Sequence, residues 1–224
     1  MKQFVAREHE IEPVPGLPGY LPEGEEMLWQ GRPSARLVAR HVLKTRWIAG
    51  YFALLAVWAI VGGFYDGRPI AGIVFSVAVL TALATVLIGM LELFAWAVGK
   101  TTLYTITSRR VVIRFGVAFS MTLNLPFKQM NALSLADLGG GAGHVAIELL
   151  PGHRLSWLLQ WPHVRAWRFA DPEPSLICLG DAKKAADILA LAITQYASLN
   201  SGHARLEEGA PELAAVPPAV MAAE

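Results

Sequence analysis

The chain has 224 residues, of which 54% are hydrophobic and 17% are charged, and its formal net charge is +1. Soluble domains carry about a quarter charged residues, so this composition favours a membrane protein. A nearly neutral chain is not a nucleic-acid-binding polycation, and we expect no nucleic acid among its partners. The single cysteine, Cys178, excludes an internal disulfide, so the soluble part requires no oxidising compartment.

The residues before the first apolar segment predict a strand and then a basic helix. Apolar and polar residues alternate in Glu26–Gly31, which is typical of a strand. Pro33 and Ser34 form a helix start signal, so we predict a helix from Ser34 to Arg46. Three basic residues share one face of this helix: Arg36, Arg40 and Lys44. They are candidates for binding lipid headgroups, although the bias for basic residues beside membrane helices also explains them.

Two uncharged segments, Trp47–Phe64 and Ile70–Leu91, have the length and composition of membrane-spanning helices. The linker Tyr65–Pro69 contains glycine and proline and predicts a tight turn, so the two helices should be antiparallel neighbours. Nine basic residues flank the outer ends of this hairpin, whereas the linker has only Arg68. The positive-inside rule therefore predicts a two-pass protein with both termini in the cytoplasm. The alternative is a hairpin buried in a large soluble core.

Small residues recur every four positions in the second segment, at Thr81, Thr85 and Gly89. Such a stripe allows another helix to approach closely. The partner is either a helix of another protein or a second copy of the chain, or else the stripe packs against the first segment. Glu92 either extends to the membrane surface or faces a partner. Neither segment contains histidine, so we do not expect the hairpin to ligate a pigment.

From residue 101 onwards the pattern changes to short strands followed by one helix. Strands are predicted at 103–107, 111–115, 117–125, 129–135, 145–149, 155–160 and 175–179, and a helix from Ala182 to about Leu199. Gly139–Gly143 reads as a flexible loop, and Pro151–His153 as a hairpin turn. The prediction is an α+β fold, a small antiparallel β-barrel or sandwich with one C-terminal helix, attached to a membrane hairpin. If strand 26–31 pairs with the later strands, the hairpin interrupts the sheet domain.

This reading divides the chain into five parts. They are an irregular segment at 1–23, the first strand and basic helix at 24–46, the membrane hairpin at 47–98, the cytoplasmic domain at 99–200, and a disordered tail at 201–224. The tail is assigned from its content of Ala, Pro and Glu.

Tryptophan and arginine, the residue types enriched at binding hot spots, gather between residues 157 and 168. The candidate partner-binding residues in this segment are Trp161, His163, Arg165, Trp167 and Arg168. We expect Trp157 and Trp161 to lie in the core and residues 163–168 to be exposed. A loop held by Pro162 is the alternative. Arg109 and Arg110, in a predicted hairpin turn, are either further lipid-headgroup residues or part of the turn itself.

No catalytic constellation is evident. The six histidines are dispersed without metal-ligand spacing, and neither a nucleophile elbow nor a carboxylate pair stands out. We therefore expect a protein that is not an enzyme and that carries no metal or other cofactor.

Two motifs resemble bacterial pleckstrin-homology-like membrane proteins, namely GEEMLWQGRP at 24–33 and YTITSRRV at 104–111. Three further motifs resemble the PuhB family of photosynthetic complex assembly proteins of purple bacteria. They are EPVPGLP at 12–18, MTLNLPFKQ at 121–129 and LQWPHVR at 159–165. This resemblance covers roughly residues 10–197, and the chain departs from it mainly in the glycine-rich loop and the tail.

The resemblance implies a pleckstrin-homology-like fold and a non-enzymatic role. Such a factor would assist assembly of the photosynthetic reaction centre and its light-harvesting 1 core antenna in the inner, intracytoplasmic membrane. Its implied partners are reaction-centre and core antenna subunits, membrane lipids and a second copy of the chain. The alternative function is a generic lipid-binding module.

Overall fold

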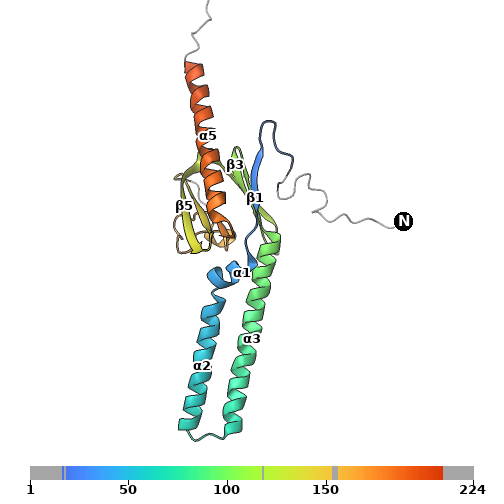
Figure 1. The fold of residues 1–224 in the computed structure, drawn as a ribbon, viewed down its shortest axis with the longest axis vertical. Helices are drawn as coiled ribbons and strands as arrows, with labels where there is room; N and C mark the ends of the chain where they lie inside the picture. The colour runs from blue at the N-terminus through green and yellow to red at the C-terminus, as the bar shows by residue number, and fades with distance from the viewer. Residues whose placement is uncertain (1–16, 18, 118, 153–155, 209–224) are drawn as a thin grey trace, which may run out of the picture.

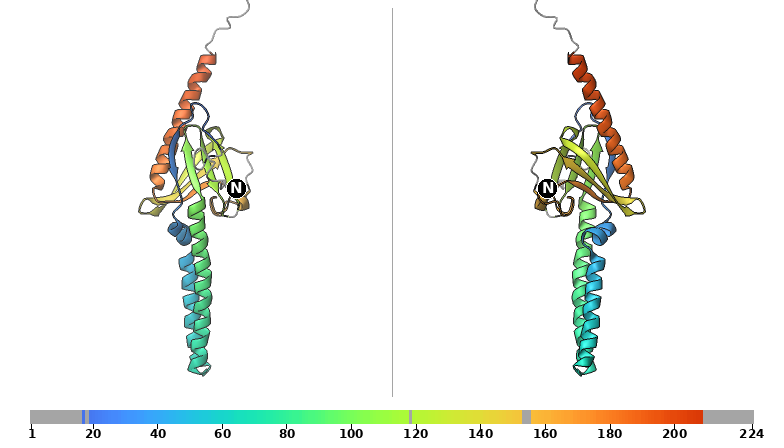
Figure 2. Two further views of the ribbon diagram at one scale, coloured as in Figure 1. Left: turned by 90° about the vertical axis from the view of Figure 1, so that its right-hand side faces the viewer. Right: turned by 90° about the vertical axis from the view of Figure 1, so that its left-hand side faces the viewer.

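A long helical hairpin projects from one end of a β-domain, and a C-terminal helix extends beyond the other end (Figure 1). The computed structural model describes residues 17, 19–117, 119–152 and 156–208. Figure 2 shows the same end-to-end arrangement from two further sides, in which one hairpin helix lies largely in front of the other.

The hairpin consists of α2 (Thr45–Tyr65) and α3 (Ile70–Thr101), which confirms both predicted apolar helices. Both are long and apolar enough to span a membrane, and only 6% of the most apolar window of each is buried. This exposure argues against a hairpin in a soluble core. At 1.5 Å per residue, α3 is about 48 Å long, whereas a bilayer core is about 30 Å thick. The last turns of α3 therefore extend into the β-domain, where Ala95 and Val98 are buried in its core.

The two hairpin helices are in close contact near the linker. A Cβ atom on Gly63 would lie 2.6 Å from Cγ1 of Ile73, so the absence of a side chain permits this contact. Further along α3, the residues turned toward α2 recur at helical spacing. They are Leu80, Ala84, Ile88 and Leu91, all partly buried.

The continuous helix predicted from Ser34 to Arg46 is wrong. The chain forms α1 (Ala35–Leu37) and then the π-helical segment η2 (Val38–Val42), in which the N–H of Leu43 donates to the carbonyl of Val38 (3.0 Å). Lys44 adopts a left-handed backbone (φ 55°), which ends the segment before α2 begins. The regular basic stripe is therefore interrupted, and Lys44 lies at the corner between η2 and α2.

Two antiparallel sheets and one helix form the β-domain. The first sheet has the order β1 (Met27–Gly31), β2 (Leu103–Thr107), β3 (Arg110–Phe115) and β4 (Met121–Pro126). The second has β5 (Met130–Gly139), β6 (Ala142–Leu149) and β7 (Ser175–Leu179). The short turn η3 (Phe127–Gln129) joins the sheets, and α5 (Ala182–Glu208) packs on β5 and β6. This arrangement confirms the predicted α+β class, a pleckstrin-homology-like antiparallel sandwich with one C-terminal helix.

The hairpin is inserted into the first sheet. β1 precedes the hairpin and pairs with β2, which follows it, through partners such as Gln30 with Thr105 and Gly31 with Tyr104. The N–H of Ser34 also donates to the carbonyl of Cys178 at the end of β7 (2.9 Å). These contacts confirm that the hairpin interrupts the β-domain.

The strand predicted at 155–160 is wrong. Trp157–Gln160 forms the helical turn α4, with the N–H of Gln160 donating to the carbonyl of Ser156 (3.3 Å). β6 pairs with β7 instead, through Ala146 and Ser175. The end of the predicted turn, His153, and the start of the predicted strand, Leu155, lie outside the described residues.

Several element boundaries differ from the prediction, and three of them have a structural consequence. β4 begins at Met121 and not at residue 117, because Gly116 (φ +128°) turns the chain so tightly that a Cβ would overlap the carbonyl of Phe119. β5 continues to Gly139, so the expected flexible loop is reduced to a tight turn into β6. Helix α5 runs to Glu208, so the boundary expected at residue 200 falls inside it. Residues 209–224 of the expected tail lie outside the described part.

Gly143 in β6 lies where β5 and α5 meet. A Cβ atom there would be 2.5 Å from the carbonyl oxygen of Ala136 and 2.9 Å from Cβ of Ala182. We expect Gly143→Ala to lower the free energy of unfolding by about 1–3 kcal/mol, because backbone would have to move. Chemical unfolding of the full chain in detergent micelles measures this. Gly180→Ala, with open space around it, is the control and should change stability by less than about 0.5 kcal/mol. Equal stability of the two variants would contradict this account of the packing.

Candidate docking surfaces

The small-residue stripe of α3 lies on the outside of the hairpin. Thr81, Thr85 and Gly89 are all exposed, so the alternative that they pack against α2 is wrong. The hydroxyls of Thr81 and Thr85 each donate to a carbonyl one turn earlier (2.8 Å), which satisfies them within the helix. Glu92 is exposed as well and, seven residues after Thr85, projects from the same side of α3. The four predicted residues therefore form one face that α2 does not cover.

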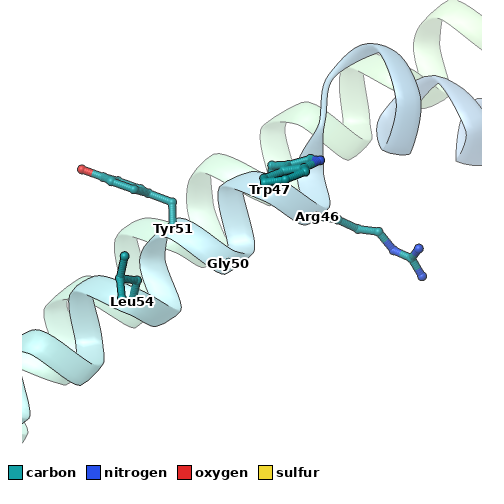
Figure 3. A pocket seen from close by; sticks show the side chains of 5 residues that line it. All are labelled: Arg46, Trp47, Gly50, Tyr51 and Leu54. Atoms are coloured by element: carbon teal, nitrogen blue, oxygen red, sulfur yellow. The ribbon is translucent and has the colours of Figure 1, made fainter.

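Two aromatic residues, Trp47 and Tyr51, project from the beginning of α2 (Figure 3). A shallow hollow of about 410 Å³ is lined by Arg46, Trp47, Gly50, Tyr51 and Leu54. Trp47 is 79% exposed, and the Arg46 side chain extends on the opposite side of the helix from Tyr51 and Leu54. Tryptophan and tyrosine concentrate at membrane–water interfaces. This turn of α2 therefore has the residues expected at a bilayer boundary.

His163 does not lie on a docking surface, contrary to the prediction. It is 2% exposed, with Nδ1 2.7 Å from the hydroxyl of Tyr104 and Nε2 3.2 Å from the hydroxyl of Thr102. The Tyr104 oxygen also accepts the N–H of Ile177 (3.2 Å), which leaves its own proton available for Nδ1. A neutral imidazole protonated at Nε2 satisfies this network, which ties the segment after α4 to β2 and β7.

Arg165 and Arg168 are exposed but share one buried carboxylate. Nη1 of Arg165 lies 2.9 Å from Oε2 of Glu173, and Nη1 of Arg168 lies 3.1 Å from Oε1. Of the two arginines, only Arg165 makes a hydrogen bond to the Glu173 carboxylate with good geometry. The two arginines hold the segment to the chain just before β7. Glu173 was not among the predicted site residues, although it is the second acidic residue after Arg168.

Two of the three tryptophans of this segment, Trp157 and Trp161, are more exposed than predicted, whereas Trp167 is exposed as expected. Trp161 is 41% exposed and stacks on Phe94 of α3, with ring centroids 5.7 Å apart. Trp157 is half-buried and packs against Phe169 at 4.8 Å. Trp167 is 85% exposed, and its left-handed backbone (φ 66°) is uncommon for such a residue. The prediction that Trp157 and Trp161 belong to the core is therefore wrong.

A groove of about 630 Å³ separates this segment from the second sheet, and we call it the sheet groove. Its floor is made of small residues on adjacent strands, with Ser134 opposite Ala146 and Ala146 opposite Ser175. Its walls are aromatic, from Trp157, Trp161, Trp167 and Phe169. His41, Val42 and Lys44 line it from the corner before α2. Part of β5 has a small residue at every second position, namely Ala132, Ser134 and Ala136. This pattern is visible in the sequence and could have indicated the hollow.

His144, on β6, faces the sheet groove. Its Nδ1 accepts the N–H of Cys178 (2.9 Å), so the neutral ring carries its proton on Nε2. Burial, and then the positive charges of His41 and Lys44, lower the pKa of His144. The charged side chain nearest this corner of the groove lining is that of Lys44.

The five predicted headgroup residues fall into two separate groups. Arg36, Arg40 and Lys44 are exposed close to the start of α2. Arg109 and Arg110 lie at the turn between β2 and β3, and the five residues of β2 place this turn about 17 Å from the end of α3. Arg110 makes two hydrogen bonds to the carboxylate of Glu25 (2.8 and 2.9 Å). This supports the alternative that these two arginines are part of the turn and do not bind lipid headgroups.

Comparison with known families agrees with this architecture. The profile of the family described as Bacterial PH domain matches residues 46–193, from the first turn of α2 into α5. The chain belongs to the bacterial PH domain family, PH standing for pleckstrin homology.

A relative extends the similarity to nearly the whole chain. It is a 23.7 kDa protein in the puhA 5′ region of Rhodobacter capsulatus. The two are 35% identical over 211 residues, which is 94% of each chain. No solved structure gives a significant match.

The buried imidazole makes stability depend on pH. Burial lowers the pKa of His163 from 6.5 to about 3. Between these values the unfolded chain binds a proton that the folded chain does not, so stability decreases as the pH falls below 6.5. We expect the His163 contribution to fall by about 2 kcal/mol between pH 7 and pH 5. Unfolding of wild type and His163→Gln at both pH values measures it, because glutamine does not titrate. An equal loss of stability in both proteins would contradict the assignment.

Proposed function

We propose that this protein is a non-enzymatic assembly factor for the photosynthetic reaction centre and light-harvesting 1 core complex. The observation that carries the proposal is the similarity, over 94% of each chain, to the protein in the puhA 5′ region. The puhA neighbourhood implies a photosynthetic context for that relative. The motifs at 12–18, 121–129 and 159–165, which resemble the PuhB family of assembly proteins, point the same way.

The exposed face of α3 supports a role in the membrane. Thr81, Thr85 and Gly89 leave a shallow surface against which a partner helix can pack closely. Nothing within 4 Å would meet a Cβ atom on Gly89, so this surface is open in the single chain. A reaction-centre or core antenna helix is the proposed partner, and self-association into a homodimer through the same face is the alternative.

The connection between the hairpin and the β-domain supports a role both within the membrane and at the cytoplasmic side of a complex. Only Thr102 separates the end of α3 from β2, and Thr102 lies in the buried network of His163. A subunit bound at the hairpin and a cytoplasmic subunit bound at the β-domain would therefore be held in a defined relation. Trp167 and Phe169, exposed beside the sheet groove, are the aromatic contacts available for the second subunit.

The proposed location is the bacterial inner, intracytoplasmic membrane. The β-domain, both termini and the nine basic residues would lie on the cytoplasmic side, and the linker with Arg68 on the other side. A generic lipid-binding module that uses all five predicted headgroup residues has less support, because Arg109 and Arg110 lie far from the hairpin.

Deletion of the gene in its phototrophic host tests the proposal. We expect membranes of the deletion strain to contain less reaction centre and core antenna, because their subunits would assemble inefficiently, while pigment synthesis continues. Near-infrared absorption of membranes and quantification of total extracted pigment measure the two effects. Normal complex levels in the deletion strain would refute the proposal.

A pair of glycine substitutions then tests the role of the α3 face. Gly89→Leu, expressed in the deletion strain, should restore complex levels less well than wild type because the larger side chain keeps a partner helix away. Gly50→Leu is the matched control, since Gly50 is also a hairpin glycine with open space around it. Equal restoration by the two variants, at equal protein levels, would mean that this face is not used.

A further inference from the structure

The second sheet has a long strand at its edge. β5 is at the end of the order β5-β6-β7 and lies on the outer side of the β-domain (Figure 1). It has ten residues, whereas the other strands at sheet edges, β1, β4 and β7, have five or six. In the part of the chain that the structure describes, β6 is the only strand that pairs with β5. Seven of the ten β5 residues are exposed. The outward N–H and C=O groups of β5 are therefore open to a further strand.

The opposite edge of this sheet, at β7, is closed by other parts of the chain. The N–H of Ser175 donates to the carbonyl of His163 (2.9 Å), in the segment after α4. The N–H of Ile177 donates to the hydroxyl of Tyr104 (3.2 Å), in the first sheet. The packing of the β-domain thus satisfies one edge of the sheet, and it leaves the β5 edge without a partner among the described residues.

The sequence of β5 does not protect this edge. Natural edge strands are commonly blunted by lysine, by proline or by an inward-pointing charge. β5 contains no lysine, arginine or proline, and its one charged residue, Asp137, is near its end. Register shifts interrupt the pairing with β6 before Ala132 and after Asp137. Between these two residues the pairing is continuous, which gives a regular edge about 20 Å long.

Both faces of this regular edge leave space for the side chains of an added strand. On one face, Ser134 and Ala136 are small and line the sheet groove. On the other face, Leu133 packs against the core, but Leu135 remains 48% exposed. The side chains of an added strand alternate between the two faces. Those on the first face would enter the sheet groove, and those on the second would cover Leu135.

Lys44 adds a charge preference at one end of the edge. It lines the sheet groove together with His144, which is paired with Ala136 of β5. Among the described residues, no carboxylate is paired with Lys44. The charge of Asp137 lies on the opposite face of β5 from Ala136, because successive side chains alternate. An acidic side chain on the groove face of an added strand would therefore complement Lys44.

We propose that the edge of β5 from Ala132 to Asp137 binds an extended segment of another polypeptide as an added antiparallel strand. The segment has about six residues, with small or apolar side chains at alternate positions and an acidic side chain near its N-terminal end, beside Lys44. The antiparallel direction is that of every strand pair in the described residues. The inference deepens the proposed function and rests on it for the source of the segment, a subunit of the complex under assembly.

Photo-cross-linking from the edge tests this inference in native membranes. The photoreactive residue p-benzoylphenylalanine replaces Ala132, Leu135 or Asp137, which are all exposed, in the full chain expressed in the deletion strain. Mass spectrometry then locates the cross-linked residue in the partner. We expect a single partner polypeptide and a reversed order. From Ala132 to Asp137, the cross-linked residue should move by about five positions toward the N-terminus of the partner, because antiparallel strands pair residue by residue.

Three substitutions, combined with the photoreactive residue at position 132, test the edge and its charge. Leu135→Lys places a charge on the edge and should lower the cross-link yield by about tenfold, because edge lysines oppose strand addition. Leu191→Lys makes the same change at an exposed position of α5 and should leave the yield unchanged. Lys44→Gln should lower the yield by about two- to fivefold, the effect of losing one exposed ion pair. If Leu135→Lys fails to fold, Lys44→Gln carries the comparison.

Any of four results would overturn the inference. They are the absence of a cross-link to another polypeptide, cross-links only to a second copy of this chain, cross-linked residues without the reversed order, and a wild-type yield in Leu135→Lys or Lys44→Gln. The identity of the partner tests the proposed function separately. The reversed order on a protein outside the photosynthetic complex would support strand addition and contradict the assembly role.

Discussion

The pairing of β1 with β2 is the interaction on which the remaining architecture depends. These strands flank the hairpin in the sequence and are hydrogen-bonded neighbours in the sheet, so both ends of the hairpin enter the β-domain side by side. The bond from Ser34 to Cys178 adds the second sheet to the same junction. Because the hairpin is attached at both ends, the corner at Lys44 and the stacking of Trp161 on Phe94 can form reproducibly at the bilayer boundary.

Local patterns were sufficient to predict most of the elements. Uncharged length identified α2 and α3, and aromatic and β-branched content identified β2. The predicted bounds of β2 and β7 are the observed ones. The failures have a common physical cause, which is that long-range contacts decided the local structure. Residues 157–160 have the composition of a strand, but β6 takes β7 as its neighbour, so this segment folds as a helical turn. The same applies to the helix after Ser34, where burial of Val38 and Ala39 against the domain accompanies the π-helical geometry.

The candidate site was predictable in composition but not in orientation. The sequence placed tryptophan, histidine and arginine in one segment, and their enrichment indicated a binding surface. Which side chains face inward depends on partners about sixty residues away, Thr102 and Tyr104, which bury His163. A single sequence does not reveal such a pairing, because nothing in the segment itself distinguishes a histidine that anchors from one that binds. The small-residue floor of the sheet groove is different, since its period-two pattern on β5 is visible in the sequence.

The unbroken course of α3 has a geometric consequence for anything that contacts both parts of the molecule. The helix runs without interruption from the linker to Thr101 and passes directly to β2. Each residue of an α-helix adds 1.5 Å of height and about 100° of rotation. The number of residues between Gly89 and Thr101 therefore sets the distance of the β-domain from the bilayer. It also sets the angle about the helix axis between the opening of the sheet groove and the small-residue face. Evolution can redirect one surface with respect to the other by inserting or deleting a single residue, without altering either.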